Sequence, residues 1–107
     1  MKIHNNDATW FTETATDIGT AFSLATSSLL YQEKSAYQDI EIYETKTFGN
    51  LMVLDGFIML TTRDNFSYHE MTSHPALFSH ANPKHVAIVG GGDCGTLQQV
   101  AQHICVE

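Results

Sequence analysis

VAIVGGGDCGTLQQV, residues 86–100, is the stretch that decides the fold. Four apolar residues, 86–89, lead into a glycine run, and a segment compatible with a helix follows. A buried strand, a glycine loop and a helix are how a nucleotide-binding α/β sheet begins. The pattern therefore predicts a buried strand over residues 86–89, a helix over residues 96–103 and the first β-α unit of a nucleotide-binding domain.

The glycine run has the spacing of a ligand-binding loop. Gly90, Gly92 and Gly95 satisfy G-x-G-x-x-G, and Gly91 and Asp93 lie within the run. Glycine lets a backbone approach a ligand closely, and a following helix points its N–H groups at that ligand. A carboxylate at position 93 would repel a pyrophosphate, which favours a ligand without phosphate or one with positive charge. The alternative is a tight turn in which Asp93 caps the helix.

The composition fits a small globular protein and excludes one class of partner. Of the 107 residues, 43% are hydrophobic and 16% are charged, which is typical of a folded domain. The formal net charge of −7 argues against nucleic-acid binding, which needs a basic surface. An acidic surface is compatible with a cationic small molecule.

The two cysteines and the hydropathy pattern bear on the cellular compartment. On one continuous helix, Cys94 and Cys105 would lie roughly 16 Å apart, too far for a disulfide. Reduced thiols are typical of a cytoplasmic protein. Residues 1–7 lack the apolar core of a signal peptide, and no stretch of the chain has membrane-spanning length.

The first sixty residues have the pattern of an antiparallel sheet. Residues 20–34 predict one long strand or two short ones, and residues 37–46 alternate between apolar and polar side chains. Residues 48–50 mark a turn. Asp55 and Gly56 separate two apolar runs and predict a type I′ hairpin, because both residues tolerate positive φ.

A helical pattern follows the strands. Thr62 or Asp64 can cap a helix, and Pro75 predicts either a kink or two separate helical pieces. The chain therefore divides into a β-domain over residues 1–62, a connecting helical segment over 63–82 and the start of a nucleotide-binding domain over 83–107.

Two stretches carry a resemblance to a known family. YQDIEIYETKTFGNLMVLDGFIMLTTRDNFSYHEM (residues 37–71) and HPALFSHANPKHVAIVGGGDCGTLQQV (residues 74–100) closely resemble the spermidine synthases of the polyamine aminopropyltransferase family. The resemblance extends from about Trp10 to the end of the chain. The segments YQ, LDG, YHEM and GGGD occur in the family's order and spacing.

The resemblance implies an α+β to α/β fold: an N-terminal antiparallel β-sheet domain, a kinked helix and the first β-α unit of a Rossmann-like, methyltransferase-type domain. It implies transfer of an aminopropyl group from decarboxylated S-adenosylmethionine to putrescine, giving spermidine and methylthioadenosine. It implies that no metal or redox cofactor takes part and that the nucleoside donor is a co-substrate. The implied partners are polyamine and nucleoside ligands and further copies of the chain, as a dimer or tetramer.

The family's binding residues are carried over only where its motifs match. Gln38 resembles the glutamine that contacts the nucleoside donor or its thioether product. Tyr68 and His69 resemble residues that line the polyamine and aminopropyl channel, and some members have Gln in place of His69. Asp93 resembles the carboxylate that holds the aminopropyl amine.

The chain departs from the family pattern in two respects. Cys94 stands where members usually carry Gly or Ala. No residue can be assigned as the ribose-binding acid or the general base, so no catalytic residue is identified. We expect little or no transfer activity from these 107 residues alone, and residues 83–107 should pack poorly in a monomer.

The residues also allow three alternatives to an aminopropyltransferase. The first is a non-catalytic β-domain remnant that acts in oligomerisation or partner binding. The second, an NAD-dependent oxidoreductase, is disfavoured by Asp93 and by the β-domain that precedes the loop. The third is a metal site, which the histidine spacings 69 to 74 and 80 to 85 do not support, because neither is the i, i+4 pair of a helical face.

Overall fold

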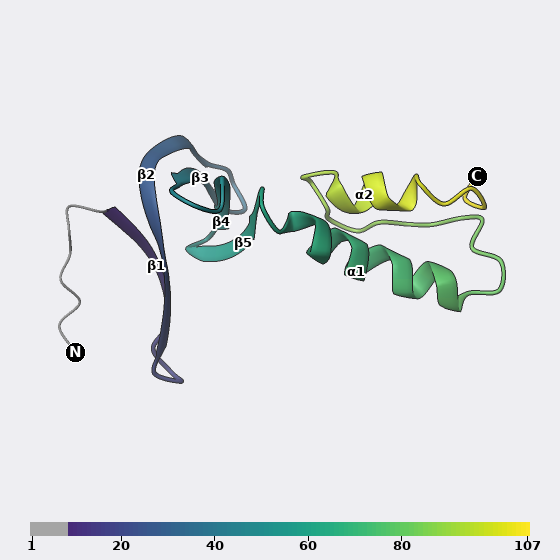
Figure 1. Cartoon of the computed structure of the whole chain (residues 1–107), viewed down its shortest axis with the longest axis horizontal. Coiled ribbons are helices and arrows are strands. Elements are labelled where there is room, and N and C mark those ends of the chain that lie inside the picture. Colours follow the sequence, from purple (N-terminus) through teal and green to yellow (C-terminus); the bar gives the residue numbers. More distant parts are fainter. Residues whose placement is uncertain (1–8) are drawn as a thin grey trace. The chain divides into compact units, whose positions relative to one another are not determined.

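The computed structural model describes residues 9–107. The chain divides into two compact units, Met1–Arg63 and Asp64–Glu107. The first unit contains a sheet and the second contains two helices (Figure 1). Neither helix in the described part of the chain is long and apolar enough to cross a membrane.

The first unit is a five-stranded antiparallel sheet in which each strand pairs with the next in the sequence. The predicted antiparallel sheet is confirmed, and residues 20–34 form one long strand rather than two. A strand before residue 20, which no individual pattern had indicated, forms one edge. The strands are β1 (Thr9–Ala15), β2 (Thr20–Lys34), β3 (Asp39–Thr45), β4 (Asn50–Leu54) and β5 (Phe57–Thr61).

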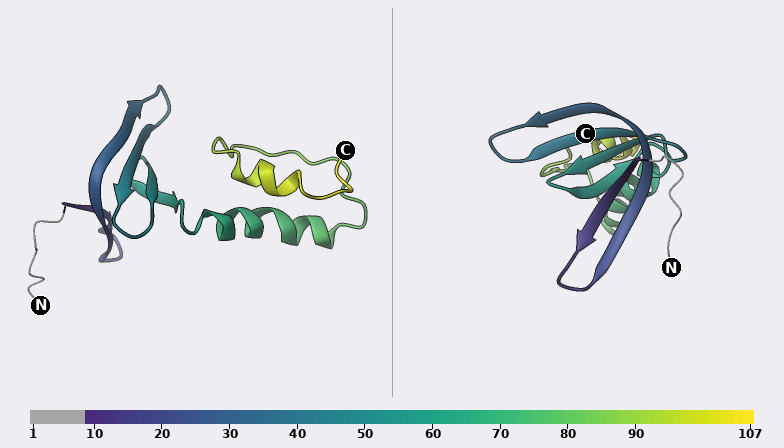
Figure 2. Two further views of the ribbon diagram at one scale, coloured as in Figure 1. Left: turned by 45° about the horizontal axis from the view of Figure 1, so that its top comes forward. Right: turned by 90° about the vertical axis from the view of Figure 1, so that its left-hand side faces the viewer.

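The long strand β2 is curved, as Figure 2 shows. Its register against β3 shifts twice, between Thr26 and Ser28 and between Leu29 and Tyr31. Each shift places an extra residue in one strand, which bends the strand and increases its twist. The curvature therefore has a local cause in the pairing of β2 with β3.

The core of the first unit forms on one face of this sheet. Leu51 and Val53 of β4 are fully buried, as expected for residues two apart on a strand. Leu24 of β2 completes the buried cluster. Four partly buried side chains pack against it: Phe11, Tyr43, Phe48 and Ile58.

The turn between β4 and β5 is the hairpin that the sequence predicts. Asp55 and Gly56 have φ values of 52° and 82°, the left-handed conformation that a type I′ turn requires of both residues. The Asp55 carboxylate also accepts a hydrogen bond of 2.8 Å from the backbone N–H of Asp39. Asp55 therefore has a structural role, in the turn and at the start of β3.

In the second unit, helix α1 (Asn65–Ser79) lies beside helix α2 (Gly95–Val100) (Figures 1 and 2). Asp64, one of the two predicted caps, stands at the N-cap position of α1, but its side chain makes no cap hydrogen bond. The buried residues of α1 recur every four positions, and those of α2 do the same, so each helix turns one stripe inward. These buried residues are His69, Ser73 and Leu77 of α1 and Thr96 and Val100 of α2.

The alternative of two helical pieces around Pro75 is wrong, because α1 continues through this residue. Pro75 lacks the N–H that an interior helical residue donates. The buried stripe continues on both sides of it, with Ser73 before and Leu77 after. Packing of this stripe offsets the missing hydrogen bond. Ser79 adds a further contact by donating its hydroxyl to the carbonyl of Pro75 at 2.6 Å.

The predicted buried strand over residues 86–89 is wrong. The segment is not assigned as a strand, and Val86 and Val89 are 39% and 99% exposed. A strand needs a neighbour for its hydrogen bonds. Within residues 9–107, every strand belongs to the sheet of the first unit.

The predicted helix over residues 96–103 is shorter than expected. It ends at Val100, and residues 101–102 continue as a turn. The N–H of Ala101 still bonds four residues back, to Leu97 at 2.9 Å. The N–H of His103 bonds only three residues back, to Val100 at 3.1 Å, which is the tighter pattern common at helix ends.

Candidate functional site

The centre of the candidate site is a contact between helix α1 and the glycine loop. Nε2 of His69 lies 2.7 Å from Oδ2 of Asp93. The His69 side chain is 7% exposed and that of Asp93 is 25% exposed. The structure therefore brings together two of the predicted ligand residues, which are 24 positions apart in the sequence.

His69 is held in place by its own helix. It is the first residue of the buried stripe of α1, one turn before Ser73. The buried Ser73 hydroxyl donates a 2.6 Å hydrogen bond to the carbonyl of His69. Ser73 was not predicted as part of the site, although its position four residues after His69 is the spacing at which such a contact forms.

The glycine loop has a backbone that favours glycine. Gly90 and Gly91 have φ values of 81° and 64°, which residues with a side chain rarely adopt. Cys94 also has a positive φ, 62°, and its N–H donates to the carbonyl of Gly91 at 2.9 Å. This turn places Asp93 at the end of α1 that contains His69.

Asp93 does more than cap the following helix, which was the alternative interpretation of the glycine loop. Cys94 is the N-cap of α2 and makes no side-chain cap hydrogen bond. Oδ1 of Asp93 accepts a long hydrogen bond of 3.3 Å from the N–H of Gly95. The shorter contact of the carboxylate is the one between Oδ2 and His69, so Oδ1 is the oxygen with the weaker hydrogen bond.

Tyr68 lies next to this pair. Its ring centroid is 5.4 Å from that of His69, in an edge-to-face arrangement, and the residue is 55% exposed. An exposed phenol beside a histidine and a carboxylate provides an apolar face and a polar tip. Three of the four predicted ligand residues, Tyr68, His69 and Asp93, are therefore neighbours.

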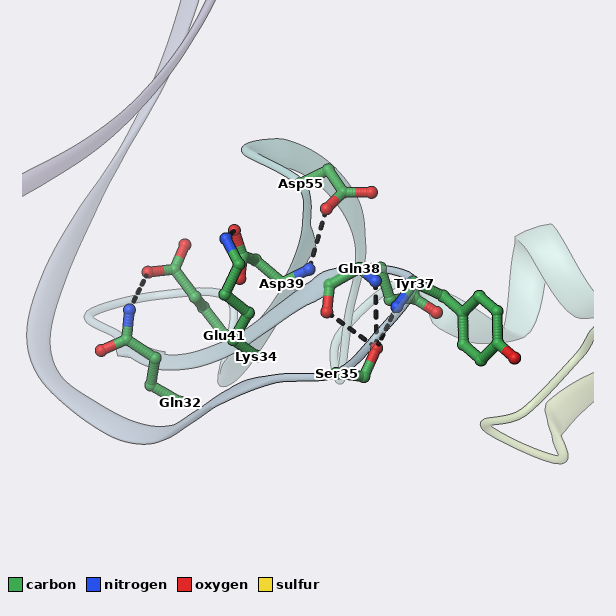
Figure 3. A network of polar contacts seen from close by, with 8 residues as sticks. All are labelled: Gln32, Lys34, Ser35, Tyr37, Gln38, Asp39, Glu41 and Asp55. Carbon is green, nitrogen blue, oxygen red and sulfur yellow. Dashed lines mark hydrogen bonds and ion pairs between the residues drawn. The ribbon is translucent and has the colours of Figure 1, made fainter.

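Gln38 belongs to the first unit, in the turn between β2 and β3 shown in Figure 3. The Ser35 hydroxyl accepts hydrogen bonds from the N–H groups of Tyr37 and Gln38 at 3.1 and 3.0 Å and donates to the carbonyl of Gln38 at 3.0 Å. These contacts fix the backbone of Gln38. Within residues 9–107, the hydrogen bonds of Gln38 involve its backbone and not its side-chain amide.

A second histidine pair in this unit was missed by sequence reasoning. Nδ1 of His74 lies 2.8 Å from Nε2 of His103, and the ring of Phe78 lies 5.0 Å from that of His103. No sequence signal links residues 29 positions apart in separate segments. The contact joins α1 to the turn that follows α2.

Across residues 9–107, no three or more His, Cys, Asp or Glu side chains gather closely enough to hold a metal ion. Cys94 and Cys105 are exposed free thiols.

Comparison with known proteins assigns both units of the chain. The family profile described as "Spermidine synthase tetramerisation domain" matches residues 9–62. The profile described as "Spermine/spermidine synthase domain" matches residues 65–107.

Curated relatives and solved structures agree with these profiles. The chain is 61% identical over 97 residues to a polyamine aminopropyltransferase of Thioalkalivibrio sulfidiphilus, covering 91% of this chain and 34% of the relative. It is 60% identical over 98 residues to one of Nitrosococcus oceani, covering 92% and 34%. The chain thus spans about a third of the length of the curated relatives it matches.

Two crystal structures share the fold. A spermidine synthase in complex with the transition-state analogue AdoDATO matches all of this chain and 36% of its own, with a TM-score of 0.88 and 37% identity. The spermidine synthase of Thermotoga maritima has the same TM-score and identity and is covered over 38% of its length. The chain belongs to the spermidine and spermine synthase family, as a portion that includes the N-terminal sheet domain and the start of the synthase domain.

Proposed function

We propose that this chain forms part of an aminopropyltransferase site, which transfers an aminopropyl group from decarboxylated S-adenosylmethionine to putrescine. Spermidine and methylthioadenosine are the products. The observation that supports this best is the Asp93 carboxylate in the glycine loop, held by His69 at 2.7 Å. Membership of the synthase family and the likeness to a synthase that binds AdoDATO support the same reaction.

The chemistry of the donor suits this loop. Decarboxylated S-adenosylmethionine carries a sulfonium and an ammonium group and no phosphate. A carboxylate stabilises such cations by charge-assisted hydrogen bonds, whereas it would repel a pyrophosphate. We assign Asp93 to the ammonium of the aminopropyl group, with Oδ1 as the oxygen that remains available.

We assign the two remaining predicted ligand residues, Tyr68 and Gln38, one to each substrate part. The exposed ring of Tyr68 gives the aminopropyl chain an apolar surface beside His69. We assign Gln38, in the first unit, to the nucleoside because its segment resembles the family's nucleoside-contacting glutamine. The reaction is a displacement at carbon by a neutral amine, so in-line positioning would supply much of the rate.

We assign the sheet to self-association, as a dimer or tetramer. One matching profile is described as a tetramerisation domain. Exposed apolar surface of this extent on a small sheet is typical of an interface. The large apolar residues of the sheet strands that are at least 45% exposed are Trp10, Phe22, Leu29, Leu30, Tyr31, Phe57 and Met59.

Calorimetric titration of the chain tests the ligand assignment. Decarboxylated S-adenosylmethionine and methylthioadenosine should bind, and NAD should not. Asp93→Asn should weaken the binding of the decarboxylated donor much more than the binding of methylthioadenosine, because only the donor carries the aminopropyl ammonium. The matched control is His85→Ala, at an exposed histidine. Equal weakening of both nucleosides would contradict the assignment of Asp93 to the ammonium group.

Transfer itself is tested with the same chain. We expect little or no spermidine from putrescine and the decarboxylated donor with these 107 residues alone, because no residue among them is assigned as general base or ribose acid. Measurable spermidine would overturn this expectation. Saturable NAD binding in place of nucleoside binding would instead favour an oxidoreductase.

A further inference from the structure

The first residue of helix α2, Gly95, is a glycine that its own backbone does not require. Five glycines of the described chain have positive φ, and Gly95 is not among them. Gly95 belongs to a right-handed helix, whose backbone conformation alanine adopts without strain. The reason for a glycine at position 95 must therefore lie in its surroundings.

The surroundings are the ring of His69. A Cβ atom placed on Gly95 would lie less than 3.0 Å from three atoms of the imidazole, Cε1, Nδ1 and Nε2. Real Cβ atoms essentially never approach other atoms so closely. The ring thus occupies the space that a side chain at position 95 would need.

The ring has little room to withdraw. The His69 side chain is 7% exposed, so other protein atoms surround the ring on most sides. A side chain at position 95 would have to move the imidazole or separate α2 from α1. Either movement would break the 2.7 Å contact between Nε2 of His69 and Oδ2 of Asp93.

We propose that Gly95 is a positioning residue for Asp93, acting through His69. The absent side chain admits the imidazole, and the imidazole then holds Oδ2 of Asp93. The backbone N–H of Gly95 donates to Oδ1 from the other side at 3.3 Å. The carboxylate is thereby oriented before ligand arrives, with Oδ1 available for the ammonium group. This last step rests on the proposed function, whereas the packing of Gly95, His69 and Asp93 does not.

The test combines Gly95→Ala with a matched control, Gly92→Ala. Gly92 is in the same loop, its φ is not positive, and a Cβ there would meet nothing within 4 Å. Nuclear magnetic resonance of the labelled chain reports the imidazole nitrogens of His69 and the carboxyl carbon of Asp93. Gly95→Ala should shift the Asp93 carboxyl signal to its position in His69→Ala, and Gly92→Ala should leave it in place. Unchanged His69 and Asp93 signals in Gly95→Ala would overturn the proposal.

A double variant covers the case in which Gly95→Ala does not fold. If the imidazole is the obstacle, Gly95→Ala should lower the urea midpoint of the unmodified chain or abolish its folding, and should leave the midpoint of His69→Ala unchanged. The same loss with and without the ring would overturn the proposal, because the clash would then lie elsewhere.

Ligand binding separates this proposal from the function on which it rests. Gly95→Ala should lower the affinity for decarboxylated S-adenosylmethionine by roughly tenfold and change the affinity for methylthioadenosine little. This is the effect expected when one charge-assisted contact is misplaced. If the Asp93 signal shifts and the donor still binds as before, the ligand role of Asp93 is wrong. The positioning of Asp93 by Gly95 and His69 would then still hold.

Discussion

The imidazole of His69 contacts the carboxylate of Asp93 through a 2.7 Å bond between Nε2 and Oδ2. The histidine is almost fully buried in helix α1, and the aspartate is partly exposed in the glycine loop. The bond thus connects a fixed side chain to one that faces solvent. It ties the loop to the helix and sets the orientation of the carboxylate.

Removal of the His69 ring should destabilise the chain. His69→Ala leaves Oδ2 of Asp93 without its partner and leaves a void beside Gly95, so we expect a loss of about 1–2 kcal/mol in the free energy of unfolding. His69→Gln keeps an N–H donor and should lose less. Urea unfolding followed by circular dichroism measures both.

The control for this prediction is His85→Ala, at an exposed position. A surface substitution of this kind should change the free energy of unfolding by about 0.5 kcal/mol or less. If His69→Ala were as mild as His85→Ala, the contact with Asp93 would make no measurable contribution to stability.

Features that depend on neighbouring residues could be predicted from the sequence. Asp55 and Gly56 predict their hairpin because the turn needs only two adjacent residues that tolerate positive φ. The start of α1 directly after Asp64 is an equally local feature, although the Asp64 side chain makes no cap hydrogen bond. The antiparallel sheet follows from short strands joined by such turns.

Features that depend on residues far apart in the sequence could not be predicted from the sequence. The run 86–89 is apolar enough for a strand, yet a strand forms only beside another one. His69 and Asp93 were each predicted to bind ligand, but their contact joins residues whose separation in the sequence gives no signal. The place of Gly95 against the imidazole depends in turn on that contact.

The hairpin residue Asp55 should matter for the stability of the sheet. Asp55→Ala places a non-glycine residue without a polar side chain at φ 52° and removes the acceptor for the Asp39 N–H. We expect a loss of about 1–2 kcal/mol, part from the left-handed conformation and part from the hydrogen bond. Asp55→Asn tolerates this conformation and keeps an acceptor oxygen, so it should retain most of the stability. Equal losses in thermal or urea unfolding would contradict this explanation.

The apolar surface of β2 should control self-association. Leu30→Ser places a hydroxyl on a residue that is 51% exposed, so it should leave the fold intact and shift the chain toward smaller assemblies. Sedimentation at matched concentrations measures the shift. Ile104→Ser, at a fully exposed apolar residue of the second unit, is the control and should leave assembly unchanged. The same distribution of species in both variants would exclude Leu30 from the interface.

Tyr43 should make stability depend on pH in the alkaline range. Burial, the hydrogen bond to Glu41 and the charge of that carboxylate raise the pKa of Tyr43 above its ordinary value. The folded chain therefore holds the phenolic proton more tightly than the unfolded chain does. This contribution to stability is fully present below the unfolded pKa of about 10 and is lost as the pH rises through the folded pKa.

Tyr43→Phe removes this dependence. Between about pH 8 and about pH 11, the unmodified chain should lose more free energy of unfolding than the variant, since only it contains this titrating group. Tyr37→Phe is the control, because Tyr37 is 94% exposed. A Tyr43→Phe curve parallel to that of the unmodified chain would show that this phenol does not contribute to the alkaline loss.

Cys94 is expected to be a destabilising residue in the glycine loop. Its φ of 62° is left-handed, a conformation that costs a residue with a side chain about 1–2 kcal/mol. Glycine avoids this cost but loses about 0.4–1 kcal/mol through the greater freedom of the unfolded chain. Cys94→Gly should therefore raise the free energy of unfolding by about 0.5–1 kcal/mol. Cys105 is also exposed but has no positive φ. Cys105→Gly therefore relieves no backbone strain, increases the freedom of the unfolded chain and should not stabilise the fold. Equal effects of the two substitutions in urea unfolding would show that the backbone at position 94 is not strained.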